Sequence, residues 1–239
     1  MTSRRATQNV GLWRPWIQIV LLAITGGSPL LARVPPQTSN SRPRTRGRAA
    51  GLKRHSTLTI TLRIYNYARV APAALTEAEN VASVILRKAG IESAWIDCPL
   101  SEADLAGYPA CQRPPTPSQF VLRLVAQPLP NYSDAHEDEI GLALPCRETE
   151  AGCSAYLSYK SVMNWAGRAD TSADRILGHV MLHEIGHLLL GPGSHSETGV
   201  MRRDWDVDDL ASMAQRFICF TSGQAHAVRA EVRIRSKGP

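Results

Sequence analysis

Signatures of three common functional classes are absent from this sequence. It contains no glycine-rich phosphate loop and no G-x-S-x-G turn of the kind that presents a nucleophilic serine. Only 6% of its residues are aromatic, and no segment combines aromatic with basic side chains as a nucleic-acid platform would. Its five cysteines include no C-x-x-C pair, which argues against a thiolate zinc site. We therefore expect no nucleic-acid partner, no phosphate-loop chemistry and no serine hydrolase.

Acidic residues are absent from the first 76 positions. These positions hold 12 Lys and Arg, whereas the other 15 basic residues and all 21 acidic residues follow them. The net charge of +6 therefore comes from the N-terminal part. We expect a solvated, arginine-rich tether. The alternative is a segment that makes peripheral contact with anionic lipid or a cell-envelope polymer.

Residues 1–33 have the layout of a secretory signal. Arginines precede an apolar run over residues 16–25, and small residues and a proline follow at 26–29. The run is short for a full membrane span. These features predict a signal peptide or an uncleaved N-terminal membrane anchor. The rest of the chain would then be secreted, or lie in a periplasmic or extracellular space.

The remaining chain divides by composition into a linker and one domain. Residues 34–54 are rich in Pro, Ser, Thr, Gly and Arg, and such a segment buries too little apolar surface to fold. Residues 55–239 are numerous enough for a single domain with a proper core. No internal repeat is present. We expect a basic flexible linker followed by one monomeric domain.

The cysteines fit an oxidising compartment. Cys98 and Cys111 flank a proline-rich loop, and Cys146 and Cys153 close a short loop between two predicted strands. We predict the pairs 98–111 and 146–153, with Cys219 left over. Free buried thiols are the alternative.

The motif H-E-x-x-H, which begins at His183 and ends at His187, is the most informative feature of the chain. Two histidines four residues apart lie one turn apart on one face of a helix, close enough to share a metal ion. Apolar residues at helical spacing over residues 173–190 predict a buried helix that ends at a Gly-Pro-Gly break. Glu184, between the two histidines, is placed to take a proton from metal-bound water.

A third histidine, His195, follows the motif after seven intervening residues. Three neutral imidazoles with one open position form a typical catalytic zinc site, in which bound water becomes nucleophilic near neutral pH. Carboxylates are alternative third ligands: Glu197, Asp204, Asp206, Asp208 and the more distant Glu231. Acidic residues over 204–209 are also typical of the start of a helix. We therefore expect His195 to be the third ligand.

His179 extends the four-residue spacing of the motif histidines. Eight residues separate it from His187, which corresponds to about 12 Å along a helix. Both rings cannot then reach one zinc ion at about 2.1 Å. We interpret His179 as a core histidine or as a neighbour of the ligands.

The motif, the third histidine, Ser196 and the run Gly199-Val200-Met201 together resemble a metzincin metallopeptidase, closest to the matrixin type. The resemblance implies that His183, His187 and His195 bind zinc, that Glu184 is the general base, and that Met201 forms a turn beneath the metal. The family spacing is H-E-x-x-H-x-x-G-x-x-H, so the third histidine comes two residues late here. The Gly-Pro-Gly break can absorb the extra length, because glycine reaches backbone angles that other residues avoid.

The order of predicted elements indicates an α+β domain. It resembles the zincin architecture, in which a mixed sheet packs on the active-site helix and further helices follow. We expect residues 154–159 to be the edge strand that pairs with an extended substrate. The predicted strands cover residues 57–70, 91–97, 119–126, 140–144 and 154–159. The predicted helices cover residues 76–88, 173–190, 206–219 and 222–235.

These features predict a zinc-dependent endopeptidase acting on peptides or proteins. Its activity should fall below about pH 6, as the histidines protonate and release metal. No oxyanion-stabilising residue can be named, because Tyr156 and Tyr159 are more typical of strand residues. Trp205 is more typical of a core residue than of a substrate pocket. The alternative function is a catalytically silent, zinc-bearing binding domain of the cell envelope, in which Glu184 would have no role.

Overall fold

The computed structural model describes residues 57–128, 140–146 and 152–237. The predicted signal or anchor and the linker lie outside these residues, so both remain predictions. The described residues all belong to one unit, Lys53–Pro239. Within them, no helix is both long and apolar enough to cross a bilayer.

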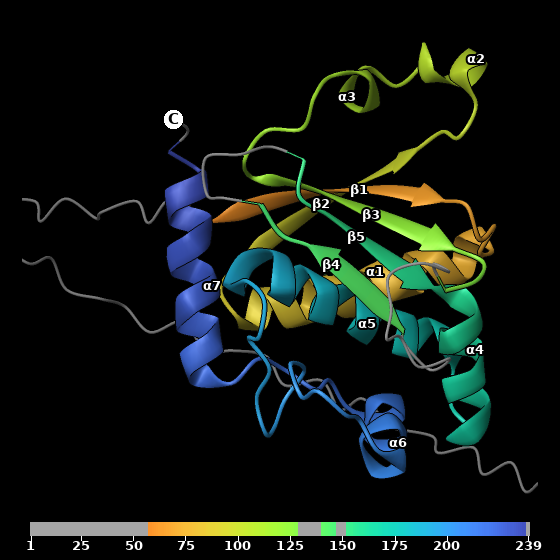
Figure 1. Cartoon of the computed structure of the whole chain (residues 1–239), viewed down its shortest axis with the longest axis vertical. Helices are drawn as coiled ribbons and strands as arrows, with labels where there is room; N and C mark the ends of the chain where they lie inside the picture. Colours follow the sequence, from red (N-terminus) through yellow and green to blue (C-terminus); the bar gives the residue numbers. More distant parts are fainter. Residues whose placement is uncertain (1–56, 129–139, 147–151, 238–239) are drawn as a thin grey trace, which may run out of the picture. The chain divides into compact units, whose positions relative to one another are not determined.

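One mixed sheet forms the frame of the described part (Figure 1), and its strand order is β2-β1-β3-β5-β4. The first four strands in this order run parallel, and β4 is antiparallel to β5. In β1, Ile60, Leu62 and Ile64 are each at most 1% exposed and alternate with residues of the other face, as the pattern predicts. The strands are β1 Thr59–Asn66, β2 Glu92–Cys98, β3 Gln119–Val125, β4 Gly141–Leu144 and β5 Ser154–Ser158.

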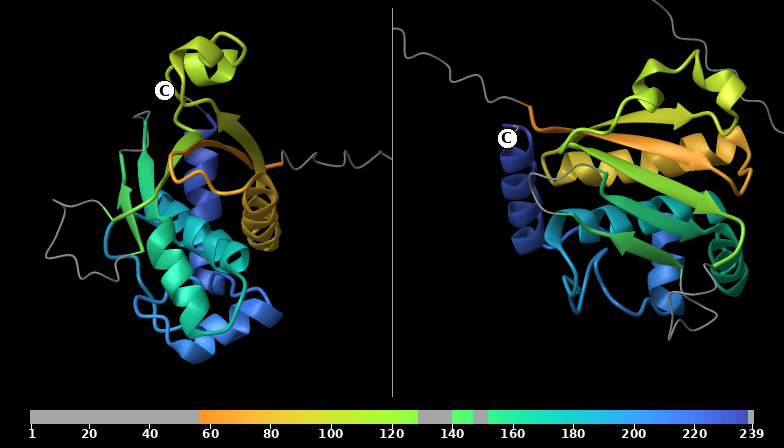
Figure 2. Two further views of the ribbon diagram at one scale, coloured as in Figure 1. Left: turned by 90° about the vertical axis from the view of Figure 1, so that its right-hand side faces the viewer. Right: turned by 45° about the horizontal axis from the view of Figure 1, so that its top comes forward.

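The two long helices α1 and α5 cover the same face of the sheet (Figures 1 and 2). Helix α5, Ala173–Leu190, carries the histidine motif over its predicted range, and most of its residues are buried. Helix α1, Pro72–Lys88, begins four residues before the predicted start. Proline is tolerated there, because the first turn of a helix leaves its N–H groups without intrahelical partners.

The remaining helices include three that the sequence pattern did not predict, α2, α3 and α4. Helix α4, Tyr159–Arg168, follows β5 directly, and the Ser158 hydroxyl accepts a hydrogen bond from the backbone N–H of Ser161 at 3.2 Å. Two short helices, α2 and α3, lie between β2 and β3, and the last two, α6 and α7, follow the motif. Their bounds are α2 Glu102–Leu105, α3 Pro109–Gln112, α6 Val207–Gln215 and α7 Ser222–Arg235.

The predicted edge strand is wrong. Residues 154–159 include β5, which lies between β3 and β4 and is therefore interior. The edge beside the motif helix is β4, a strand of only four residues that are all half-buried. The α+β class, the mixed sheet on the motif helix and the C-terminal helices agree with the prediction.

Both predicted disulfides are present, Cys98–Cys111 and Cys146–Cys153, and Cys219 is a free thiol. The first disulfide ties the end of β2 to α3. The second closes the loop that connects β4 to β5. The alternative of free buried thiols is therefore wrong for these four cysteines.

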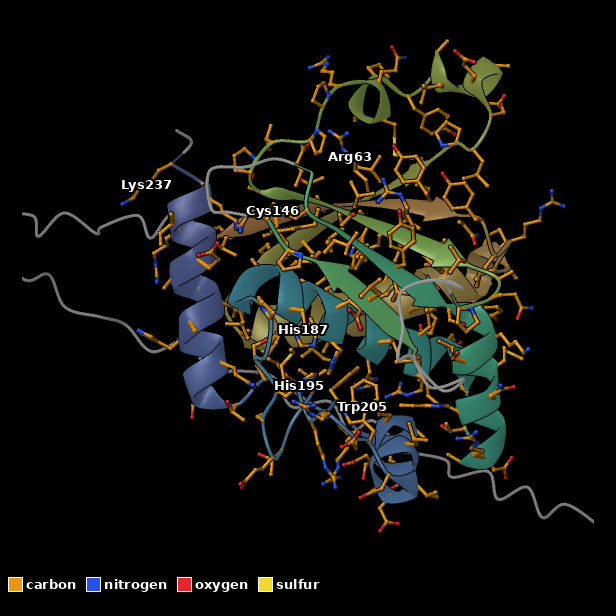
Figure 3. The ribbon with its side chains drawn as sticks, in the orientation of Figure 1. Arg63, Cys146, His187, His195, Trp205 and Lys237 are labelled. Carbon is orange, nitrogen blue, oxygen red and sulfur yellow. A yellow bond between two sulfur atoms is a disulfide. The ribbon has the colours of Figure 1, made fainter. Side chains whose placement is uncertain are left out.

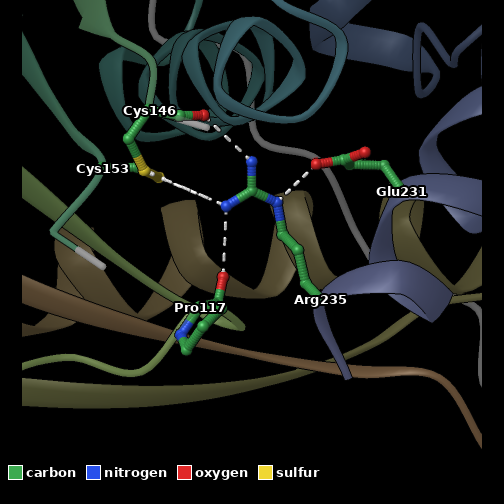
Figure 4. Close-up of a disulfide and its surroundings, with 5 residues drawn as sticks. All are labelled: Pro117, Cys146, Cys153, Glu231 and Arg235. Atoms are coloured by element: carbon green, nitrogen blue, oxygen red, sulfur yellow. Dashed lines mark hydrogen bonds and ion pairs between the residues drawn. A yellow bond between two sulfur atoms is a disulfide. The ribbon is translucent and has the colours of Figure 1, made fainter. Parts of the chain in front are cut away.

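Arg235, in the last turn of α7, is 4% exposed and connects this helix to the loop between β4 and β5 (Figure 4). Its guanidinium donates hydrogen bonds to the carbonyl oxygens of Pro117 at 3.3 Å and Cys146 at 3.2 Å. It also pairs with the Glu231 carboxylate at 2.6 Å. Its Nη1 lies 3.4 Å from Sγ of Cys153. The charge is thus buried with both an ion-pair partner and hydrogen-bond acceptors, as a buried guanidinium requires.

Candidate active site

The structure brings together the three histidines singled out from the sequence (Figure 3). His183 and His187 come from α5, and His195 comes from the loop after it. Nε2 of His187 lies 3.0 Å from Nε2 of His183 and 3.1 Å from Nε2 of His195. One nitrogen from each ring can be chosen so that all three lie within 4.8 Å of one another. Among the described residues, no other group of three or more His, Cys, Asp or Glu residues has such geometry.

The hydrogen bonding of His183 fixes where its proton lies. Nδ1 is 2.8 Å from the carbonyl oxygen of Val200, which only accepts, so Nδ1 carries the proton. The lone pair of Nε2 therefore points toward the other rings. Burial lowers the pKa of His183 to about 4, so this ring is neutral near pH 7. It is in the state that a metal ligand needs.

The other two rings are also in environments that disfavour charge. Burial, followed by the charge of His195, lowers the pKa of His187. Burial, followed by the charge of Arg203, lowers the pKa of His195. Converging nitrogen lone pairs repel one another, and a cation between them removes that repulsion. The separations are slightly shorter than the roughly 3.4 Å expected between two nitrogens on a tetrahedral zinc ion. The residues thus fit zinc with a small opening of the cluster.

Glu184 is 3% exposed and lies beneath the edge strand. A Cβ atom on Gly141 of β4 would lie 2.6 Å from Cδ of Glu184 and still closer to Oε1. Only glycine allows the strand backbone to approach the carboxylate so closely. The carboxylate is therefore held between the motif helix and β4.

The loop between α5 and Met201 turns at glycines. Gly191, Gly193 and Gly199 have φ angles of 85°, 74° and 82°, a region that other residues rarely adopt. The backbone N–H of Ser196 donates to the carbonyl oxygen of Met201 at 2.9 Å and closes the loop. The Gly-Pro-Gly break thus accommodates the longer spacing to the third histidine.

Met201 is fully buried beneath the histidines. A Cβ atom on Gly186, in the motif, would lie 3.0 Å from Cε of Met201 and closer still to Sδ. The methionine therefore packs against α5 between the two helical histidines. Its neighbour Val200 supplies the carbonyl oxygen that orients His183, a partner that no sequence pattern indicated.

Trp205 packs partly buried against the core, as expected, and it also contacts a histidine of the cluster. Its ring centroid lies 5.3 Å from that of His183, with the rings at 82°. Trp165 of α4 contacts Trp205 edge-to-face at 5.9 Å. Sequence spacing could not predict this pair, because 40 positions separate the two tryptophans.

The alternative carboxylate ligands have other roles or positions. Asp206 caps α6 and pairs with Arg202 at 2.9 Å. Glu231 pairs with Arg235 in α7. Neither these residues nor Glu197, Asp204 and Asp208 join the group of three histidines.

The two candidate tyrosines also have structural roles. Tyr156 pairs with Arg123 of β3 and Leu142 of β4, and the Arg123 guanidinium lies 5.3 Å from its ring. Its neighbours in β5, Ala155 and Leu157, are fully buried in the core, so Tyr156 points to the opposite face. Tyr159 begins α4 and packs on the core, so it is a helix residue and not the strand residue that we expected.

His179 is a core histidine. It is fully buried, and Nδ1 donates to the carbonyl oxygen of Arg175 at 2.8 Å. Nε2 accepts a hydrogen bond from the backbone N–H of Ile218 at 3.1 Å. Burial lowers the pKa of His179 to about 4. Both nitrogens are used within the protein, so this ring has none to offer to a metal.

No protein-family model matches the chain, and no curated protein is significantly similar to it. Among solved structures, archaemetzincin from Methanopyrus kandleri is similar at 15% identity with a TM-score of 0.47, over 74% of this chain and 98% of that one. Metalloproteinase-II from Bacteroides fragilis is similar at 10% identity with a TM-score of 0.46, over 74% of this chain and 54% of that one. Similarity at this level does not establish a family.

Proposed function

We propose that this protein is a zinc-dependent endopeptidase of the metzincin type, with His183, His187 and His195 as ligands and Glu184 as general base. One observation carries the proposal. Three neutral imidazoles direct nitrogens toward one point, and a buried carboxylate lies between two of them on the same helix. Met201, packed beneath these histidines, takes the place of the turn methionine.

Zinc held by these three nitrogens would polarise the scissile carbonyl and lower the pKa of a bound water. Glu184 is placed to accept a proton from the attacking water at a carboxylate oxygen and to deliver it to the nitrogen of the leaving amine. Gly141 keeps the β4 backbone against this carboxylate and restricts the positions it can occupy. Val200 keeps the His183 proton on Nδ1, so its Nε2 stays available as a ligand.

A peptide substrate fits the edge of the sheet. Strand β4 pairs with β5 on one side and with no other strand of the described chain on its other side. An extended peptide can add to this edge through main-chain hydrogen bonds. Because Gly141 of β4 lies over Glu184, a peptide paired there would pass close to the general base.

The alternative is a catalytically silent, zinc-bearing binding domain. A structural zinc site is normally closed by a fourth protein ligand. No fourth His, Cys, Asp or Glu among the described residues joins the three histidines, which leaves a position for water. This open position favours the enzyme.

We further propose that the protein works in an oxidising compartment as a secreted, periplasmic or extracellular monomer. Two disulfides within the domain support this location. The predicted N-terminal signal or anchor would deliver the chain there, and its basic segment would make any peripheral contact with membrane or envelope.

The decisive experiment is cleavage of a mixed peptide library by the zinc-loaded full chain, with Glu184→Gln as the matched variant. Loss of a general base lowers the rate by about 10²–10⁴-fold, while the three ligands and one bound zinc remain. Cleavage by the wild type alone supports the peptidase and reveals its preferred sites. If both proteins hold one zinc and neither cuts, the binding-domain function takes precedence.

A further inference from the structure

We propose that Gln224, in the first turn of α7, is a positioning residue that holds the loop carrying His195. This inference rests on the proposed function for what the loop binds. Gln224 lies 29 positions beyond His195 and outside the histidine motif. Its side chain nevertheless reaches both residues that flank this histidine.

The helix cap fixes the orientation of the Gln224 amide. Thr221 is the N-cap of α7, and its hydroxyl accepts from the backbone N–H of Gln224 at 3.3 Å. In return, Oε1 of Gln224 accepts from the backbone N–H of Thr221 at 3.1 Å. This reciprocal capping box uses the amide oxygen, so the amide nitrogen must face away from the cap.

That nitrogen faces the loop. Nε2 of Gln224 donates to Oγ of Ser196 at 3.0 Å and lies 3.4 Å from the carbonyl oxygen of Ser194. These two residues stand immediately before and after His195. One side-chain amide therefore contacts the residues on both sides of the third histidine.

Each of the two serines makes a further hydrogen bond. Oγ of Ser194 lies 3.1 Å from Nδ1 of His187. Oγ of Ser196 donates to the carbonyl oxygen of Thr198 at 2.8 Å. A short network thus joins the start of α7 to one helical histidine and to the loop of the third.

His195 needs such support because its own ring lacks an orienting bond. Its Nδ1 is buried and has no hydrogen-bond partner among the described residues. The Nδ1 atoms of His183 and His187, by contrast, have partners in Val200 and Ser194. Histidines that bind metal almost always use the second nitrogen for orientation. Here the flanking backbone must supply that orientation, and it belongs to a loop with three glycines at positive φ.

A purely structural role for Gln224, capping α7 alone, can be separated from positioning by substitution. Glutamate serves the capping box as well as glutamine does, but it lacks the NH₂ donor. Gln224→Glu therefore keeps the cap and removes the donor to the loop. Gln224→Met, of similar size and uncharged, removes both.

The first measurement is the zinc dissociation constant of the full-length wild type and both variants, by competition with a chromophoric chelator. We expect both variants to bind zinc about 10-fold more weakly, as for other outer partners of metal ligands. The melting temperature of the metal-free protein should fall only in Gln224→Met. The added carboxylate attracts cations, so weaker binding in Gln224→Glu cannot be a charge effect. Zinc affinity within twofold of the wild type in either variant overturns the proposal.

Hydrogen exchange on the metal-free proteins separates this proposal from the proposed function. Backbone amides of residues 194–198 should exchange faster in Gln224→Glu than in the wild type, while amides of α7 stay unchanged. Unchanged exchange in the loop overturns the positioning role. A wild type that binds no zinc overturns the proposed function instead, and the exchange result still decides the role of Gln224.

Discussion

His179 and His183 lie one turn apart on the same helix and look equivalent by most measures. Each Nδ1 is 2.8 Å from a carbonyl oxygen, and burial lowers the pKa of each to about 4. They differ at Nε2. That of His179 accepts the N–H of Ile218, whereas that of His183 faces Nε2 of His187 at 3.0 Å. Burial and a lowered pKa therefore do not separate the two rings, whereas the partner of the second nitrogen does.

The difference extends to the two halves of α5. Near its start, the helix packs tightly on α1, and a Cβ atom on Gly178 would lie 2.6 Å from the carbonyl oxygen of Ala78. Near its end, the same kind of close approach at Gly186 is to the flexible thioether of Met201. The first half of α5 thus packs against the rigid backbone of α1. The second half packs against a methionine side chain that can adjust beneath the histidines.

The largest expected effect comes from replacing the histidines with alanine one at a time. His183→Ala or His195→Ala should abolish tight one-to-one zinc retention, because two imidazoles remain from a site of three. His179→Ala should keep one zinc but lower the free energy of unfolding by about 2–4 kcal/mol, through a cavity and unpaired backbone groups. Zinc stoichiometry and chemical denaturation measure the two quantities. Unchanged zinc affinity in His195→Ala would show that this histidine is not a ligand.

A smaller effect should appear in the pH dependence of stability. His179 has a folded-state pKa of about 4, and its ordinary value is 6.5, so the unfolded chain binds more protons between these values. Neutral His179 therefore contributes fully to the free energy of unfolding above pH 6.5. As the pH falls toward 4, this free energy decreases by on the order of 3 kcal/mol. Denaturant titrations of metal-free protein at pH 7.5 and 4.5 should show this loss, and His179→Gln should show correspondingly less. Equal losses in both proteins would contradict the assignment.

The smallest effect should distinguish the two glycines. Gly178→Ala forces a methyl group against the backbone of α1 and should cost about 1–3 kcal/mol, as overpacking does. Gly186→Ala meets a side chain that can rotate, and alanine favours a helix over glycine by about 1 kcal/mol. Thermal unfolding of metal-free protein should therefore rank Gly178→Ala as the less stable variant. The reverse order would mean that Met201 is held as rigidly as α1.

Local spacing was enough to predict part of this structure. The positions of His183, Glu184 and His187 follow from helical periodicity, and the two disulfides follow from short loops between predicted elements. The partners of the histidines and of Glu184 were not predictable. The carbonyl of Val200, the N–H of Ile218 and the backbone of Gly141 are brought to α5 by tertiary packing, which leaves no local pattern.

The errors have the same origin. Residues 154–159 were expected at the edge of the sheet, but strand order depends on contacts between distant segments, and β4 takes that place. Helix α4 was missed because the strand pattern continues into Tyr159, and only the capping by Ser158 shows where the helix begins. Local preference could not separate the end of the strand from the start of the helix.

Helix α7 makes a contact near each of its ends that supports a segment close to the histidine cluster. Gln224 contacts the loop of His195, and Arg235 contacts the loop between β4 and β5 at Cys146. Chains are synthesised from the N-terminus, so a growing chain contains every histidine of the cluster before it contains either of these supports. Such a chain has the three proposed ligands but lacks the two contacts made by α7. We therefore expect metal loading to follow the emergence of α7.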